Sequence, residues 1–262
     1  MMTRVGGKLR AFVRAPGAAL NRCELTHLPR VPIDVERARC QHAAYVNALA
    51  ELGATIEWLA PLEDQPDAVF VEDTAVIYPE IIIMAWPGVA SRQAEVAFAD
   101  RALAQYREVH AVRPPGLLDG GDVLTIGQRV LVGLSTRTNQ AGFEQLREAL
   151  APFGYSVDSV RVRGCLHLKS ACTAIDAHRV IANLNFIERA ALGAVTIIEV
   201  DPREPRSANT LTVQGTTLFS AAYPRTGERL HAAGLRTRAI DVAELEKAES
   251  GLTCMSLLLE ES

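Results

Sequence analysis

The sequence predicts an α/β protein in which strands outnumber helices. Short apolar runs of β-type composition alternate with amphipathic helical stretches along all 262 residues. Two or three of these runs often precede one helix, which argues against a simple doubly wound parallel sheet. No Gly-x-Gly-x-x-Gly motif follows the first strand. A dinucleotide-binding fold is therefore not expected.

The individual elements follow from residue periodicity and from turn residues. The expected strands and hairpins are, in order, 8–16, 54–61, 68–88, 122–135, 156–164, 172–185, 196–200, 210–220 and a last strand that contains Cys254. The expected helices are 35–53, 91–106, 138–154 and 186–192, and 223–234 and 237–250 are further patterned stretches. Gly53 and Gly154 are the expected helix stops, and Ser91 is the expected N-cap of the helix over 91–106. The turn of the hairpin over 122–135 is expected near Gly127.

We expect one domain over residues 1–262. No Pro/Gly/Ser-rich linker and no low-complexity tract divides the chain. A strand–strand–helix–strand unit of about fifty residues would fit roughly five times, although residue identities show no repeat. Periodicity alone therefore leaves the number of units open.

Composition excludes several classes of function. The net charge is −4 and the 27 Lys and Arg are spread along the chain, so no basic footprint for nucleic acid is present. The N-terminal stretch lacks the apolar region of a secretory signal, and the longest apolar runs are too broken to cross a membrane. Five irregularly spaced cysteines predict reduced thiols in a cytoplasmic protein.

Three acids interrupt an apolar, strand-like run. The stretch PDAVFVEDTAVI carries Asp67, Glu72 and Asp73. In a strand, Glu72 and Asp73 would point to opposite faces. Burying a charge is costly without a partner, and a cationic ligand would supply one.

A cysteine and a histidine form a second candidate functional site, one suited to thiol chemistry. His167 in GCLHLKSACT and Cys254 in SGLTCMSLLLE together make the minimal inventory of a nucleophile and a base. Asp119 precedes the tight glycine turn of LLDGGDVL, and Arg92 and Arg137 each lie close to a turn. No histidine–cysteine spacing typical of a metal site is present.

The motifs FVEDTAVI, SRQAE, LDGGDVL, VGLSTRTNQAG, LHLKS and GLTCMS occur in this order and resemble those of dimethylarginine dimethylaminohydrolase. This family belongs to the guanidine-modifying, pentein-fold superfamily. The resemblance runs from about residue 12 to Cys254. It implies a five-bladed α/β propeller of ββαβ-type units around a pseudo-fivefold axis, with the site in the central channel. Such units would also explain the excess of strands.

The resemblance implies a catalytic role for three residues. Cys254 would be the nucleophile, His167 its acid/base partner, and Asp119 the acid that orients His167. Some superfamily members carry Glu at the position of Asp119, so the shorter aspartate would have to contact His167 from a slightly different place.

The resemblance also implies substrate-binding residues at Leu20, Asp67, Glu72, Asp73, Arg92 and Arg137. The two adjacent acids would hold the planar guanidinium nitrogens. The two arginines would bind the α-carboxylate of an amino-acid substrate, since bidentate arginine suits that group. Asp67 would bind the ammonium, and Leu20 would belong to a lid that closes over the substrate.

The implied reaction converts asymmetric dimethylarginine or monomethylarginine to citrulline and an amine through a thiouronium on Cys254. It needs no metal or organic cofactor and no partner beyond this small molecule, and it leaves a homodimer open. The alternatives are an arginine deiminase, which would release ammonia, and a non-catalytic arginine-binding protein on the same fold. An agmatine-type deiminase would not need both arginines. The remaining cysteines, Cys23, Cys40, Cys165 and Cys172, are expected to pack.

Overall fold

Five small sheets of three strands each form the framework of the computed structural model, which describes residues 7–261. In chain order, the strands are β1 (Leu9–Val13), β2 (Ala54–Trp58), β3 (Ala75–Ile77), β4 (Ile82–Met84), β5 (Val109–Ala111), β6 (Val123–Ile126), β7 (Arg129–Leu134), β8 (Ser156–Arg161), β9 (Cys172–Ala174), β10 (Arg179–Ala182), β11 (Thr196–Glu199), β12 (Leu211–Val213), β13 (Thr216–Ser220), β14 (Arg236–Ile240) and β15 (Leu257–Glu260). The α-helices are α1 (Val35–Glu51), α2 (Ala90–Leu103), α3 (Gln140–Leu150), α4 (Leu168–Ala171), α5 (Arg189–Leu192), α6 (Pro224–Ala232) and α7 (Ala243–Glu246). Short 3-10 turns are η1 (Ala18–Arg22), η2 (Val71–Thr74), η3 (Gly120–Asp122), η4 (Ala151–Phe153) and η5 (Thr253–Met255).

One pairing rule holds in all five sheets. The middle strand pairs antiparallel with one neighbour and parallel with the other, as in β6–β7 and β7–β8. The antiparallel pair of the third sheet is joined at Gly127, where φ is +61° and glycine is favoured. A parallel pair needs a crossover connection, and a helix supplies it each time. The strand–strand–helix–strand unit is therefore confirmed, five times over.

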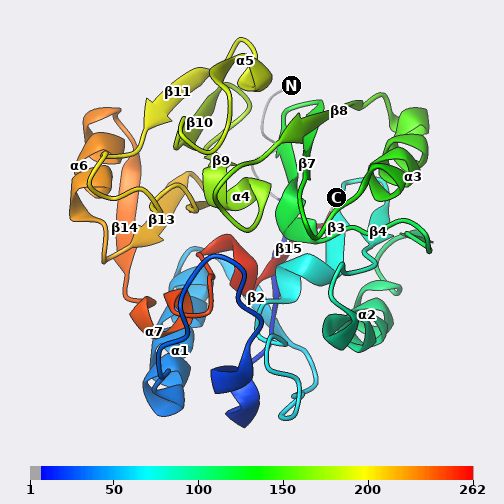
Figure 1. Ribbon diagram of the computed structural model, residues 1–262, viewed down its shortest axis with the longest axis horizontal. Helices are drawn as coiled ribbons and strands as arrows, with labels where there is room; N and C mark the ends of the chain where they lie inside the picture. Colours follow the sequence, from blue (N-terminus) through cyan, green and yellow to red (C-terminus); the bar gives the residue numbers. More distant parts are fainter. Residues whose placement is uncertain (1–6, 262) are drawn as a thin grey trace.

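The chain closes into a ring because its last strand completes the first sheet. Strand β15 pairs antiparallel with β1, in the register Leu9↔Glu260 to Phe12↔Leu257, and β1 pairs in parallel with β2. Figure 1 shows the five units following one another around the molecule, with α1, α2, α3, α5 and α6 on the outside. This closure brings the segment just before β15 to the inside of the ring.

Apolar side chains from the strands and outer helices pack in five clusters among the described residues. Helix α1 illustrates how the sequence produces this packing. The carboxylate of Asp34 caps its first turn, accepting from the Arg37 N–H at 3.0 Å. Tyr45 and Leu49, four residues apart, are both fully buried on its inner face.

Three local predictions are wrong. Helix α2 begins at Ala90 with Val89 as the N-cap, so Ser91 is not the cap, and its hydroxyl donates to Glu24 Oε1 at 2.8 Å instead. Glu72 and Asp73 lie in the 3-10 turn η2 rather than in a strand, and both are buried. Cys254 lies in η5, before the last strand rather than within it.

The helices are all too short or too polar to cross a lipid bilayer, over the part of the chain that the structure describes.

Candidate active site

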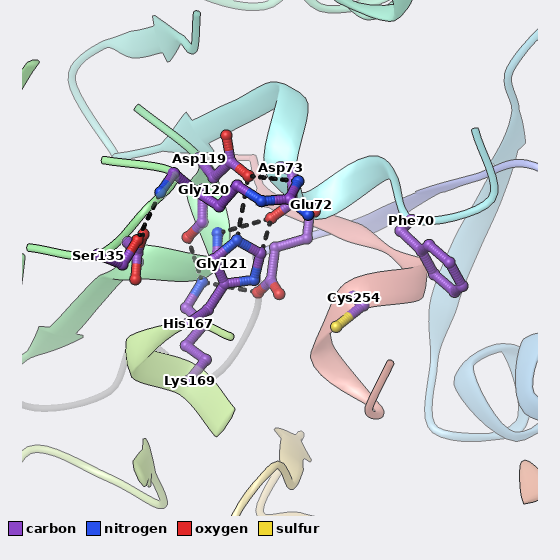
Figure 2. Close-up of polar contacts among 12 residues, drawn as sticks. Phe70, Glu72, Asp73, Asp119, Gly120, Gly121, Ser135, His167, Lys169 and Cys254 are labelled. Carbon is purple, nitrogen blue, oxygen red and sulfur yellow. Dashed lines mark hydrogen bonds and ion pairs between the residues drawn. The ribbon is translucent and has the colours of Figure 1, made fainter. Parts of the chain in front are cut away.

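Inner turns from several units converge on one small pocket with an empty volume of about 340 Å³. The turns η2 and η5, together with the N-cap residues of η3 and α4, supply one group of polar side chains, which Figure 2 shows as a cluster facing the Cys254 thiol. The pocket wall includes six of the nine predicted site residues, namely Asp67, Asp73, Arg92, Arg137, His167 and Cys254. Leu20, Glu72 and Asp119 do not line it.

Cys254 is held by the tight turn that precedes β15. Its sulfur accepts a hydrogen bond from the Gly251 N–H at 3.3 Å. A side chain at position 251 would not fit, because a Cβ there would lie 2.3 Å from Asn209 Cγ. The Ser-Gly signal in the sequence therefore marks a close backbone approach that shapes the thiol loop.

His167 and Asp119 form a buried pair. His167 Nε2 lies 3.0 Å from Asp119 Oδ2, and Asp119 is fully buried. The second oxygen of Asp119 accepts from the Gly88 N–H at 2.9 Å, which fixes the carboxylate plane. The shorter aspartate side chain thus reaches the imidazole directly.

The two glycines of LDGGD allow this turn to pack against the acidic turn η2. Gly121 N–H donates to Asp73 Oδ1 at 3.0 Å. A Cβ at Gly121 would lie 2.8 Å from both Asp73 Oδ1 and His167 Nδ1, and a Cβ at Gly120 would lie 2.0 Å from the Glu72 carbonyl oxygen. A larger residue would have to displace the Glu72 backbone at position 120, or the Asp73 and His167 side chains at position 121.

Asp73 faces both His167 and Arg92. Its Oδ1 lies 4.0 Å from His167 Nδ1, and its Oδ2 forms a buried ion pair with Arg92. Arg92 also binds Glu95 at 2.9 Å and the Phe70 carbonyl oxygen at 2.8 Å. Most donors of this guanidinium are therefore directed to the protein, and Nη1, which carries two hydrogens, donates to Asp73.

Glu72 is satisfied by protein partners. Lys169 Nζ binds one carboxylate oxygen at 2.6 Å, and the Thr253 hydroxyl donates to the other at 2.7 Å. Because Thr253 precedes Cys254 in η5, its hydrogen bond to Glu72 links η5 to η2.

The residues predicted for the amino-acid end of a substrate lie on different units. Asp67 accepts from the Glu24 N–H with both oxygens, at 3.1 and 3.3 Å. Arg137 Nη2 donates to Thr26 Oγ1 at 3.4 Å, and its Nη1 lies 3.9 Å from Asp119 Oδ2. Leu20 is fully buried in the core beneath α1, so the structure places it in the hydrophobic core and not in the pocket wall.

The surroundings of the site raise the pKa values of both the Cys254 thiol and the His167 imidazole. Burial, together with the charges of Glu72 and Asp73, raises the pKa of the Cys254 thiol to about 12. Burial alone would lower the pKa of His167, but the carboxylates of Asp73, Asp122 and Asp119 outweigh it and raise that pKa to about 9. At neutral pH the arrangement therefore favours an imidazolium beside a neutral thiol.

The neighbouring carboxyls respond in opposite directions. Burial would raise the pKa of Asp73, but the nearby His167 and Arg92 charges lower it to about 2. Burial raises the pKa of Asp67 to about 6, in spite of Arg92 and the Glu24 N–H. Asp73 is thus an anion at all ordinary pH values, whereas burial brings the pKa of Asp67 closer to neutrality.

Asp73, Asp119 and His167 are also the group in residues 7–261 whose atoms could share a metal ion, since one ligand atom from each lies within 4.8 Å of the others. Asp73 Oδ1 accepts from the Gly121 N–H, and Asp119 Oδ2 lies 3.0 Å from His167 Nε2.

Sequence reasoning missed four residues that support the site. Lys169 and Thr253 bind Glu72, and Asp122 lies behind His167, where its carboxylate accepts from the Leu168 N–H at 2.9 Å. Glu95 binds Arg92. A signal existed for Lys169, which is one of only three lysines in the chain and follows His167 by two residues.

Three comparisons with known proteins agree with this geometry. The family model described as arginine deiminase matches residues 61–222. A Streptomyces coelicolor protein named N(G),N(G)-dimethylarginine dimethylaminohydrolase is 38% identical, covering 96% of this chain and 97% of its own. The Pseudomonas aeruginosa protein of the same name is 32% identical over 86% of this chain and 89% of its own.

Solved structures confirm the fold. A citrulline complex of the P. aeruginosa enzyme, in a cysteine-to-serine variant, superimposes with a TM-score of 0.92 at 30% identity, covering 97% of this chain and 99% of that one. The N-terminal domain of the cyanobacterial arginine dihydrolase ArgZ superimposes with a TM-score of 0.86 at 17% identity over 97% of this chain and 99% of that one. The second likeness concerns the fold alone. The five-unit pentein architecture is thus confirmed, and the chain is a hydrolase that belongs to the dimethylarginine dimethylaminohydrolase family.

Proposed function

We propose that this protein hydrolyses N-methylated arginine to citrulline, with Cys254 as a covalent nucleophile. One observation supports this proposal above all. A single pocket holds a thiol, an imidazole that is hydrogen-bonded to a carboxylate, and further charged groups that suit the two ends of an amino acid. The two relatives described above carry the same activity in their names, and one solved relative holds citrulline.

The reacting end is defined by Asp73 and Cys254. A guanidinium stays protonated at neutral pH and resists attack by water, so the site must hold it and supply a stronger nucleophile. Asp73 lines the pocket and remains anionic, which suits a guanidinium nitrogen. At the other end, Arg137 is the main carboxylate contact, Arg92 adds its remaining hydrogen, and Asp67 takes the ammonium.

The proposed reaction has two covalent stages. The charge of the bound guanidinium favours loss of the Cys254 proton to solvent, and the thiolate then attacks the guanidinium carbon and forms a C–S bond. The bond from carbon to the methylated nitrogen breaks, and His167 donates a proton to the departing amine. A thiouronium remains on sulfur. His167, now neutral, takes a proton from water, the resulting hydroxide attacks the same carbon, and the C–S bond breaks to release citrulline and the thiolate. Asp119 holds the His167 ring through Nε2, so Nδ1 carries the transferred proton.

The decisive experiment compares citrulline formation from asymmetric dimethylarginine, monomethylarginine and arginine. We expect turnover of the methylated substrates and at least a thousandfold loss, roughly, in Cys254→Ser, because the covalent bond cannot form. Cys40→Ser is the matched control, since Cys40 is exposed and lies outside the pocket.

Preferred release of ammonia from arginine would instead make the protein an arginine deiminase. Binding of arginine without any citrulline would make it a binding protein. A Cys254→Ser variant with more than about a tenth of the wild-type rate would remove this cysteine from the mechanism.

A further inference from the structure

Glu249, five residues before the nucleophile, has no role in the reaction described above, but it makes an unusual set of contacts. Its carboxylate accepts hydrogen bonds from three successive backbone N–H groups, those of Thr26, His27 and Leu28, with the Thr26 contact at 3.0 Å. Successive N–H groups that converge on one point form an anion-binding concavity. The two segments are more than two hundred residues apart in the sequence, and this carboxylate joins them.

The backbone of Glu249 is also unusual. Its φ is +59°, in the left-handed region that non-glycine residues rarely adopt. Such a conformation costs free energy and persists where surrounding contacts hold it in place. The contacts of this residue include the three N–H groups of residues 26–28, which donate to its carboxylate, and the Glu246 carbonyl oxygen, which accepts from its N–H at 3.1 Å.

Segment 24–28 lies at the pocket and contacts both groups proposed for the amino-acid end of the substrate. The Glu24 N–H donates to both oxygens of Asp67. The Thr26 hydroxyl accepts from Arg137 at 3.4 Å. Asp67 and Arg137 belong to different units of the ring, so this segment is the element that links them. Figure 1 shows the blue chain after η1 passing close to the red segment that leads into β15.

Glu249 itself lines the pocket beside Ser250 and Cys254. It therefore anchors segment 24–28 to the loop that carries the nucleophile. Segment 24–28 has no helix or strand of its own, and Thr26 and His27 are exposed. Without the Glu249 carboxylate, three of its N–H groups would lose their acceptor.

We propose that Glu249 is a positioning residue for substrate selection. Its carboxylate holds segment 24–28 where that segment aligns Asp67 and Arg137 with the α-amino and α-carboxylate groups of the substrate. The inference rests on the proposed function, because it assigns those two residues to the amino-acid end. Glu249 acts on recognition of that end and not on the reacting carbon.

The test compares two substrates in two variants. One substrate is asymmetric dimethylarginine, and the other is a dimethylated alkylguanidine that lacks the α-amino and α-carboxylate groups. Glu249→Gly removes the carboxylate and suits the left-handed backbone, so the fold should not suffer from new strain. Glu249→Gln keeps the length and one acceptor oxygen. Glu204→Gln is the matched control, because its carboxylate also accepts two backbone N–H groups but lies outside the pocket.

We expect Glu249→Gly to lower kcat/KM for the amino-acid substrate by roughly thirtyfold, mostly through KM, with kcat held within about threefold. For the alkylguanidine, kcat/KM should change by less than about threefold. Glu249→Gln should recover part of the loss. An equal fall with both substrates would overturn the proposal, because Glu249 would then support the nucleophile loop.

Hydrogen exchange gives a second measurement that does not need turnover. In Glu249→Gly the amides of residues 26–28 should exchange at least about tenfold faster than in the wild type, and in Glu204→Gln they should not. Unchanged exchange would also overturn the proposal. If the wild-type protein makes no citrulline, the proposed function fails on its own, and exchange still decides whether Glu249 holds the segment.

Discussion

Cys254 lies in a site whose protein charges oppose thiolate formation. Glu72 and Asp73 face it, and the two pocket arginines are tied to other partners. The pKa of the thiol is accordingly raised to about 12, while that of His167 is raised to about 9. A resting thiolate–imidazolium pair is therefore disfavoured, and under the proposed function the guanidinium of the substrate supplies the positive charge.

This arrangement predicts slow alkylation of Cys254 by neutral iodoacetamide at pH 7. The rate should rise with pH, because the raised pKa keeps the thiol protonated until well above neutrality. A non-reacting cationic amidine that leaves the sulfur accessible should accelerate alkylation, since its charge stabilises the thiolate. The measurement is the pH dependence of labelling by mass spectrometry.

Cys254→Ser is the control for labelling of the other four cysteines. An alkylation profile that titrates well below the ~8.5 of an ordinary cysteine would mean a preformed thiolate. A resting ion pair between Cys254 and His167 would then replace substrate assistance.

Among the structural elements, short turns rather than strands or long helices hold the central site residues. The thiol and the adjacent acids lie in the 3-10 turns η5 and η2, while Asp119 is the N-cap of η3 and His167 is the N-cap of α4. Their packing depends on backbone contact distances that only glycine permits. The turn η3 is the clearest case, because it lies against both η2 and His167.

Gly121→Ala should therefore lower kcat by at least about a hundredfold, because the new methyl group displaces Asp73 or His167 and catalysis tolerates little misplacement. Overpacking of this kind should also cost about 1–3 kcal/mol in the free energy of unfolding. The checks are steady-state kinetics and chemical denaturation.

Gly227→Ala is the matched control. A Cβ there would lie 2.4 Å from the Phe219 ring, a comparably close contact on α6 and away from the pocket. It should lower stability with kcat unchanged. If both variants lose kcat to the same extent, the close fit of η3 is not the cause.

The whole molecule is a ring whose closure depends on its last strand. Leu257 and Leu259 of β15 are buried against the inner side of the first and second units, each contributing about 1.5–3 kcal/mol. Total stabilities of about 5–15 kcal/mol are typical. The two strands nearest the termini form an antiparallel pair that corresponds to the hairpin of the other units.

Deletion of residues 257–262 should therefore abolish cooperative thermal unfolding and not merely activity. A circular permutant should behave differently. It joins the natural ends by a short Gly/Ser linker and opens the exposed turn between Gly127 and Gln128, which is the equivalent hairpin turn of the third unit. We expect this permutant to unfold cooperatively, and calorimetry measures both variants. A deletion variant that unfolds cooperatively would show that ring closure is dispensable.

The sequence by itself determined the strand–strand–helix–strand order, because strand and helix periodicities and the glycine stops are local properties. Through the family resemblance of its ordered motifs, it also predicted catalytic roles for Cys254, His167 and Asp119, and these roles stay predictions. The helix ends at Gly53 and Gly154 match the left-handed backbone found there.

Only the tertiary structure decided which charges meet. Pairing of Glu72 with Lys169, and of Arg92 with Asp73, joins residues far apart in the chain, and no local pattern encodes such a contact. Burial of Leu20 in the core is likewise a tertiary property, and its role in a lid stays a prediction. The link between Glu249 and residues 26–28 exists because β15 returns to pair with β1, and that closure is a property of the whole ring.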